Sequence, residues 1–306
     1  ADIIVRRFKN MRNISLALVF VTYFGSMVMA NDMALVTFLP LGYFVLESCG
    51  NKKHTAFVFI MQNIAANLGG MLTPFGNPQN LYLYSYFAIP TGEFFKIMAL
   101  PFAVAFVLIL AVCLFVKPQP AEVQSRPKNR PPLWRVAAYS ALFVLSLLIV
   151  FRVFPYYWGL LAVVVALLAL DFRAILRVDY ALLLTFCAFF VFSGNLARIP
   201  AVSDFLGGLV GLDPLAFGVL SCQVISNVPS AVLLSKFTGD YAALLIAVNA
   251  GGLGTPIASL ASLITLNTFR RVQPGQTKGY ILKFLAFNFS FLAVLIGAGY
   301  LTLLFV

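Results

Sequence analysis

Apolar residues recur along the whole chain in blocks of about 15–25 residues, which is the length of helix that crosses a bilayer. Hydrophobic residues make up 61% of the chain and charged residues 10%, whereas a soluble domain has about 25% charged residues. Stretches such as residues 160–170 do not alternate between apolar and polar side chains, as strands of a barrel would. Backbone groups must be hydrogen-bonded within hydrocarbon. The sequence therefore predicts an all-α polytopic membrane protein.

The net charge of +11 does not require a nucleic-acid partner, because Lys and Arg collect in loops on one side of a membrane protein. The four cysteines lie far apart, and His54 is the only histidine. Neither residue type has the spacing of a metal site. We expect no cofactor beyond a coupling ion, and no partner among nucleic acids.

The first half opens with a basic, amphipathic segment at residues 1–13, which predicts an interfacial helix. A single helix over the apolar residues 14–48 would be roughly 52 Å long at about 1.5 Å per residue, and a bilayer core is about 30 Å thick. We therefore predict a re-entrant hairpin over residues 14–48 that turns at Asn31.

A broken helix is predicted at residues 55–88. Its interruption at residues 69–78 holds two prolines and three glycines, which a helix does not tolerate. A span at residues 94–116 and a proline-rich basic loop at residues 117–133 follow.

The second half repeats this order. We predict scaffold spans within residues 134–197, an interfacial helix at 200–212, a hairpin at 214–237, a broken helix at 241–267 and a last span at 280–306. Residues 67–74 and 249–256 share the pattern Asn-x-Gly-Gly-x-x-Thr-Pro in identical spacing, and an Asn-centred hairpin tip precedes each. The chain thus divides into a first repeat at residues 1–116 and a second at residues 134–306.

The charge distribution gives the repeats opposite orientations. With residues 1–13 and 117–133 in the cytoplasm, only Lys96, Arg152, Arg198 and Lys236 fall on the opposite side. The cytoplasmic set is Arg6, Arg7, Lys9, Arg12, Lys52, Lys53, Lys117, Arg126, Lys128, Arg130, Arg135, Arg173, Arg177, Arg270, Arg271, Lys278 and Lys283. The first hairpin then opens inward and the second outward. A pair of full crossings in place of the first hairpin would leave this distribution unchanged.

Inverted repeats with paired broken helices indicate a secondary transporter whose site lies near the membrane midplane. The N-terminus of a half-helix suits an anion, and unwound carbonyls suit Na⁺. The alternative is that each Gly-Gly-x-x-Thr-Pro is only a packing kink. The candidate substrate- and ion-binding residues are Asn31, Asp32, Asn67, Gly70, Thr73, Pro74, Asn77, Ser226, Asn227, Asn249, Gly252, Thr255, Pro256 and Ser259. Na⁺ is expected at Asn31, Asp32 and Thr73, and at Asn227 and Thr255.

Asp32 is the one acidic residue deep within an apolar run, where charged side chains are usually functional. Our hypothesis is that Asp32 binds a coupling proton or Na⁺. The alternative is that its carboxylate caps the helix that follows.

At these residues the chain resembles the ion transporter superfamily, which includes divalent-anion and citrate symporters, arsenite permeases and one family of sodium–proton antiporters. The resemblance rests on Asn31-Asp32, residues 73–80, residues 226–229 and residues 252–256. It implies an elevator-type carrier, usually dimeric, with a scaffold domain and a moving transport domain. In that superfamily the hairpin tips and helix breaks enclose the substrate and the cation.

The tips differ from the Ser-Asn-Thr of dicarboxylate symporters, and they look more like those of the arsenite-permease and antiporter branches. Only the second half has spans like those at residues 134–197, so we expect about two or three further scaffold helices before residue 1.

The leading hypothesis is a multi-pass carrier of the inner membrane that moves a small anion or oxyanion together with Na⁺ or H⁺. The alternatives are a sodium–proton antiporter that uses Asp32, a di- or tricarboxylate symporter and, more remotely, a passive channel. An enzyme is not expected, because the sequence offers no paired acids, metal cluster or activated nucleophile.

Overall fold

The computed structural model describes residues 10–120, 132–153, 155–176, 178 and 180–306. The interfacial helix predicted at residues 1–13 falls mostly outside this part, and residues 11–13 already belong to helix α2 (Met11–Ser26). All regular elements of the described residues are helical, as predicted. The chain forms two compact units: unit 1 comes from residues 1–125 and 190–306, and unit 2 from residues 126–189.

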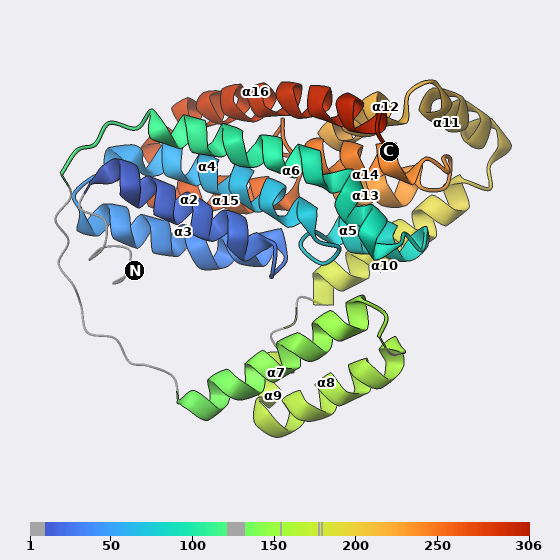
Figure 1. The fold of residues 1–306 in the computed structure, drawn as a ribbon, viewed down its shortest axis with the longest axis horizontal. Helices are drawn as coiled ribbons and strands as arrows, with labels where there is room; N and C mark the ends of the chain where they lie inside the picture. Colours follow the sequence, from blue (N-terminus) through green and yellow to red (C-terminus); the bar gives the residue numbers. More distant parts are fainter. Residues whose placement is uncertain (1–9, 121–131, 154, 177, 179) are drawn as a thin grey trace. The chain divides into compact units, whose positions relative to one another are not determined.

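The first half of unit 1 consists of a hairpin, a broken helix and a long helix (Figure 1). Helices α2 and α3 (Asn31–Ser48) form the hairpin, and Asn10 caps α2 by accepting from the Asn13 N–H at 2.9 Å. A short 3₁₀ turn, η1 (Lys52–His54), leads into α4 (Thr55–Gly69). The break holds the 3₁₀ turn η2 (Gly70–Leu72), and α5 (Pro78–Tyr86) and α6 (Thr91–Leu114) follow.

The second half of unit 1 has the same order of elements. Helix α11 (Pro200–Leu212) precedes the short hairpin arms α12 (Pro214–Ile225) and α13 (Asn227–Leu234). Helix α14 (Tyr241–Ala250) ends at the second break, and α15 (Leu260–Val272) continues beyond it. The turn η3 (Pro274–Gln276) then leads into α16 (Thr277–Leu303).

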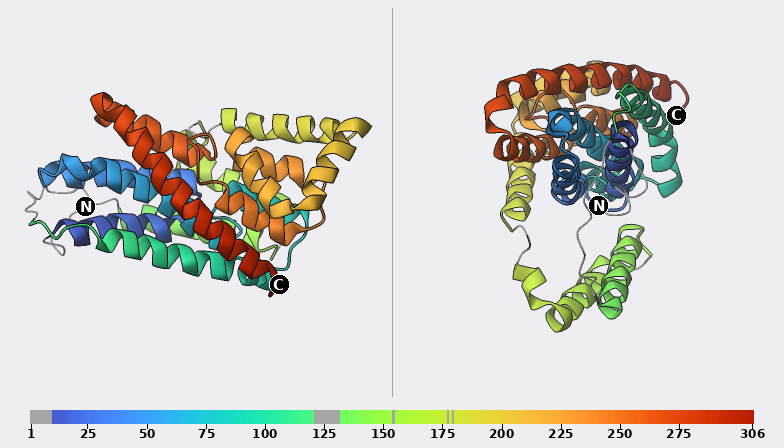
Figure 2. Two further views of the ribbon diagram at one scale, coloured as in Figure 1. Left: turned by 90° about the horizontal axis from the view of Figure 1, so that it is seen from above. Right: turned by 90° about the vertical axis from the view of Figure 1, so that its left-hand side faces the viewer.

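The two helices that end at the breaks lie at the centre of unit 1. Helix α4 packs against α2, α3, α6 and α15, and α14 packs against α5, α12, α13 and α16. Nearly every side chain of both helices is buried, which explains why their sequences are largely apolar; the buried amides Gln62, Asn63, Asn67 and Asn249 are the exceptions. Figures 1 and 2 show α16 running obliquely along the outside of this unit beside α6.

Unit 2 contains α7 (Leu133–Val150), α8 (Tyr156–Leu170), α9 (Phe172–Leu176) and the first part of α10 (Tyr180–Leu196). The Tyr139 hydroxyl donates to the Asp171 carboxylate at 2.9 Å and so ties α7 to the segment after α8. Most described side chains of α7 and α8 are exposed although they are apolar, as expected of helices whose partners are lipid or other protein.

Four helical runs of the described residues are long and apolar enough to cross a membrane: Lys52–Leu72, Thr91–Leu114, Leu133–Val150 and Pro274–Leu303. Shorter apolar helices occur at Tyr156–Leu170, Pro214–Ile225 and Tyr241–Ala250. Helix α2, with 16 residues, is only about 24 Å long at about 1.5 Å per residue, too short to cross the hydrocarbon core unaided.

Candidate functional site

The tip of the first hairpin is held against the first helix break by Asn31. Its backbone N–H donates to the carbonyl of Gly76 at 3.0 Å. Its side-chain oxygen accepts from the backbone N–H of Asp32 at 2.9 Å, and its Nδ2 donates to Oδ1 of Asn67 at 3.1 Å. Asn31 is only 2% exposed. Its backbone N–H and Nδ2 therefore fix the tip to the break and to α4, and its Oδ1 closes the first turn of α3.

Asn227 holds the tip of the second hairpin in the same way. Its N–H donates to the carbonyl of Ala258 at 2.9 Å, and its Oδ1 accepts from the N–H of Val228 at 3.0 Å. Gly76 and Ala258 each lie two residues after the proline of their break. Asn31 and Asn227 thus share the backbone bond to the break and the side-chain bond to the N–H of the next residue.

Gly252 lies where the two tips approach each other. A Cβ atom on Gly252 would lie 2.9 Å from Nδ2 of Asn227 and 3.5 Å from Oδ1 of Asn67, the oxygen that accepts from Asn31. The glycine pair of the second break is therefore needed for close approach. Both tips and both breaks converge at this point.

Asn249 joins the two halves of the chain. Its Nδ2 donates to Oδ1 of Asn80 at 2.6 Å, and its Oδ1 accepts from Nδ2 of Asn77 at 3.0 Å and from Nε2 of Gln79 at 3.4 Å. Asn77 also donates to the carbonyl of Asn67 at 3.0 Å. The predicted residues Asn31, Asn67, Asn77 and Asn249 thus form one buried amide cluster.

Two amide residues outside the predicted set hold the unwound backbone. Asn80 donates to the carbonyls of Gly70, Met71 and Thr73 at 3.1–3.2 Å in the first break. Freed carbonyls inside a membrane protein must find such donors. Asn80 lies six residues after the proline of its break, at the end of the stretch 73–80 on which the family resemblance rests.

Gln223, on the hairpin arm α12, hydrogen-bonds the unwound backbone of the second break as Asn80 does in the first. Its Nε2 donates to the carbonyls of Gly251 and Leu253 at 3.0 and 2.9 Å, and its Oε1 accepts from the N–H of Thr255 at 2.9 Å. The only signal for it in the sequence is an amide within an apolar hairpin arm.

The glycines of the breaks fit tightly around these amides. A Cβ on Gly70 would collide with Oδ1 of Asn77 and would lie 2.7 Å from the carbonyl of Gly76. Gly254 has φ of +110°, and a Cβ there would collide with Oε1 of Gln223. Side chains other than hydrogen are excluded at both positions by space, and at Gly254 also by backbone conformation.

The threonines of the two motifs are engaged in local structure. The hydroxyl of Thr73 donates to the carbonyl of Met27 at 2.8 Å, and the hydroxyl of Thr255 donates to the carbonyl of Gln223 at 3.2 Å. Each bond ties the residue before Pro74 or Pro256 to the end of the preceding hairpin arm. The prolines favour the extended backbone that Thr73 adopts.

Ser226 and Ser259 lie at the edge of the amide cluster. Ser259 caps α15 by accepting from the N–H of Ser262 at 3.1 Å. Ser226 has φ of 74°, a strained conformation for a residue with a side chain. This strain is confined to the second tip, because Ala30 at the first tip has φ of −51°.

Asp32 is half-buried in the first turn of α3. The helix N-terminus stabilises a negative charge there. No hydrogen bond or ion pair of its carboxylate is found within the described residues, and the capping position belongs to Ala30. The alternative in which Asp32 caps α3 through its side chain is therefore not supported by the geometry.

Two buried carbonyl oxygens of the cluster lack a hydrogen-bond donor among the described residues. These are Oδ1 of Asn77 and Oε1 of Gln79, and both side chains are 1% exposed. Buried acceptors without a donor carry an energetic cost. Neutral amide oxygens of this kind suit a cation such as Na⁺.

The helix termini around the cluster supply the remaining polarity. Helices α3, α5, α13 and α15 begin at the tips or just beyond the breaks. Each of the four presents backbone N–H groups without intrahelical partners and a partial positive charge. The arrangement can therefore receive an anion at the helix N-termini and a cation at the amide oxygens.

Comparison with known proteins places the chain among transporters. Residues 1–243 match the family described as citrate transporter, CitMHS. An uncharacterized transporter of Methanocaldococcus jannaschii is 34% identical over 259 residues, which cover 84% of this chain and 71% of that protein. The inner membrane protein YbiR of Escherichia coli is 34% identical over 272 residues, which cover 86% of this chain and 71% of that protein.

A shorter match of 90 residues at 32% identity links 29% of the chain to 14% of a transporter of Dictyostelium discoideum named arsB. The expected relation to the ion transporter superfamily is confirmed by these matches. The protein is a multi-pass membrane transporter, and it belongs to the CitMHS citrate transporter family.

Proposed function

We propose that this protein is a secondary active transporter that moves a small anion together with Na⁺ or H⁺ by alternating access. The observation that carries the proposal is the convergence of two hairpin tips and two helix breaks, joined through Asn31, Asn67 and Gly252. A fold that needed only rigid spans would not bury so many amide side chains beside unwound backbone.

The anion is proposed from the electrostatics of the site. Four helix N-termini surround the cluster, and the side chains there are neutral apart from Asp32. Citrate is the anion in the description of the family, and arsB is the name of one relative. Because the tips lack a threonine after their asparagine, a small oxyanion suits them better than a tricarboxylate.

Alternating access is proposed because the amide cluster is closed. Asn31, Asn67, Asn227 and Asn249 are each 1–2% exposed, so a solute reaches them only after the surrounding elements move. The matching hydrogen bonds at the two tips support two inverted repeats. Unit 1, which contains the whole cluster, is the natural moving body of an elevator, and unit 2 would belong to its scaffold. A homodimer is part of the same proposal.

The orientation is proposed from the two ends of unit 1. The starts of α2 and α4 and the ends of α6 and α15 lie together, because Met11 bonds to Gln119 and the Gln273 side chain bonds to the carbonyl of Lys52. That end carries many basic residues: Arg12, Lys52, Lys53, Lys117, Arg270 and Arg271. The other end carries Glu93 and Asp240. The positive-inside rule then puts the basic end in the cytoplasm.

The test uses the purified protein in liposomes with imposed gradients of Na⁺ or pH. Labelled phosphate, sulfate, arsenate and citrate are offered in turn, and accumulation is measured with each gradient and without either. Accumulation of one anion that requires one gradient supports the proposal. Anions that merely equilibrate, with or without gradients, would indicate a channel.

A sodium–proton antiporter is the second candidate, and Asp32 favours it. Its carboxylate is half-buried at the first tip and free of hydrogen bonds to the described residues. An antiporter moves Na⁺ against a pH gradient with no anion present. The variant Asp32→Asn should abolish that exchange. Glu47→Gln is the matched control, because Glu47 lies at the other end of α3 and pairs with Lys52 at 2.8 Å.

A further inference from the structure

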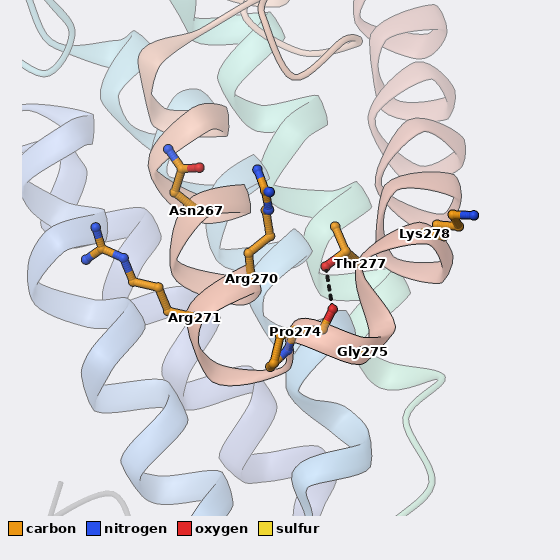
Figure 3. A pocket seen from close by; sticks show the side chains of 7 residues that line it. All are labelled: Asn267, Arg270, Arg271, Pro274, Gly275, Thr277 and Lys278. Atoms are coloured by element: carbon orange, nitrogen blue, oxygen red, sulfur yellow. Dashed lines mark hydrogen bonds between the residues drawn. The ribbon is translucent and has the colours of Figure 1, made fainter.

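A basic pocket lies at the junction of α15 and α16, at the end of the apolar helix α16. It has a volume of about 860 Å³ and is lined by Asn267, Arg270, Arg271, Pro274, Gly275, Thr277 and Lys278 (Figure 3). Thr277 donates to the carbonyl of Pro274 at 3.0 Å and so fixes the turn between the helices. The three cationic side chains are exposed. None of the described residues that line the pocket is acidic.

An apolar groove of about 520 Å³ adjoins this pocket and shares Asn267 and Arg271 with it. Its other lining residues are Leu35, Val36, Pro40 and Tyr43 of α3, and Ile264, Thr268 and Val272 of α15. From Ile264 to Val272 the groove follows α15 for roughly 12 Å at about 1.5 Å per residue. It therefore runs from the basic end of unit 1 toward the start of α15, which follows the second break.

The carboxylate of Glu47 does not compensate the positive charge of the pocket. Glu47 is already paired with Lys52 at 2.8 Å, and Lys52 is linked to the end of α15 through the side chain of Gln273. The pocket therefore keeps the positive charge of Arg270, Arg271 and Lys278. A headgroup with a negative phosphate is attracted to such a pocket between membrane helices.

We propose that this pocket and groove together bind one anionic phospholipid. The phosphate lies against Arg270, Arg271 and Lys278, and one acyl chain lies along the groove between α3 and α15. The combination of charge and apolar length favours a lipid over a free anion. Because the groove contacts α3, an arm of the first hairpin, bound lipid stabilises that hairpin against α15.

The test is a lipid titration of delipidated protein in detergent, followed by thermal unfolding and native mass spectrometry. Dioleoyl phosphatidylglycerol should bind saturably and raise the unfolding temperature. Dioleoyl phosphatidylcholine, glycerophosphoglycerol and inorganic phosphate should not. Phosphatidylcholine that binds equally well, or phosphate that gives the full effect alone, would overturn the proposal.

Variants separate the headgroup from the chain. Arg270→Gln, Arg271→Gln and Lys278→Gln combined should weaken phosphatidylglycerol binding at least tenfold. Lys283→Gln, on α16 outside the pocket, should leave binding unchanged. Filling the groove with Val36→Trp should weaken binding of the lipid, because Val36 is 54% exposed and its substitution does not disturb the core. Unchanged binding in the triple variant or the groove variant refutes the site, provided that the variants unfold like wild type without lipid.

Discussion

Asn249→Ala is the sharpest perturbation of the amide cluster, because Asn249 is the link between the second half and the first break. Its loss leaves Oδ1 of Asn80 and Nε2 of Gln79 without the partners that they have at 2.6 and 3.4 Å. Asn77 keeps its bond to the carbonyl of Asn67. Two buried groups are therefore left without these partners, and Nδ2 of Asn77 loses one of its two hydrogen bonds.

The expected loss in the free energy of unfolding follows from the two groups left without these partners. A buried polar group left unpaired costs about 1–3 kcal/mol in water-soluble proteins, and interhelical hydrogen bonds in membranes are worth about 0.6–2 kcal/mol. For two groups the first scale gives about 2–6 kcal/mol and the second about 1–4 kcal/mol. We take the range common to both, about 2–4 kcal/mol, which corresponds to a decrease of roughly 5–10 °C in unfolding temperature. We expect transport activity to fall as well, because the first break loses its anchor.

Asn288→Ala is the matched control, since it removes the same atoms from another fully buried position. Its Oδ1 accepts only a 3.5 Å contact from Asn63, and Asn63 keeps a bond to Ser262 at 3.3 Å. The control should therefore cost less than about 1 kcal/mol.

Reaction with a thiol-reactive fluorogenic dye is a suitable assay, because Cys113 and Cys222 are buried in unit 1 and become reactive as it unfolds. Both tryptophans, Trp134 and Trp158, lie in unit 2 and would not report on the cluster directly. The predicted decrease in unfolding temperature for Asn249→Ala is roughly 5–10 °C. If Asn249→Ala unfolds within about 1 °C of wild type, or at a temperature no lower than Asn288→Ala, Asn249 does not link the two halves energetically.

Three further predictions concern the tips and the second break. Gly254→Ala should destabilise the protein by about 2–4 kcal/mol, because the position combines φ of +110° with a steric collision. Gly297→Ala is its control and should unfold like wild type, because a Cβ at Gly297 meets open space. Ser226→Gly should raise the unfolding temperature by relieving a backbone strain of about 1–3 kcal/mol. Ala30→Gly at the unstrained first tip should lower the unfolding temperature. If Ser226→Gly unfolds at a lower temperature than Ala30→Gly, Ser226 is not strained. Asp32→Asn should retain exchange of anion across liposomes but lose accumulation driven by a cation gradient, and unchanged accumulation excludes a coupling role for Asp32.

The positions of the tips and breaks could be predicted from sequence because local chemistry determines them. Two prolines and three glycines at residues 69–78 exclude a continuous helix, and the structure ends α4 at Gly69 and begins α5 at Pro78. A helix over residues 14–48 is too long for a bilayer, and the structure turns the chain between Ser26 and Asn31.

The partners of the unwound backbone could not be predicted in the same way. Asn80 and Gln223 have equivalent tasks, yet one follows its break and the other precedes its break by almost thirty residues on another helix. Only tertiary packing brings Gln223 to Gly251 and Leu253. Thr73 and Thr255 were predicted as cation ligands, but their hydroxyl protons are used in bonds to the hairpin arms. Their role as ligands stays a prediction.

Transport in liposomes tests the central claim most directly. The measurement is uptake of a labelled anion by wild-type protein, with an inward Na⁺ gradient, with an inward proton gradient and with neither. The account predicts accumulation above equilibrium that depends on one of the two gradients and is lost in Asn249→Ala. Uptake that never exceeds equilibrium, or Na⁺–H⁺ exchange that proceeds with no anion present, would contradict cation-coupled anion transport.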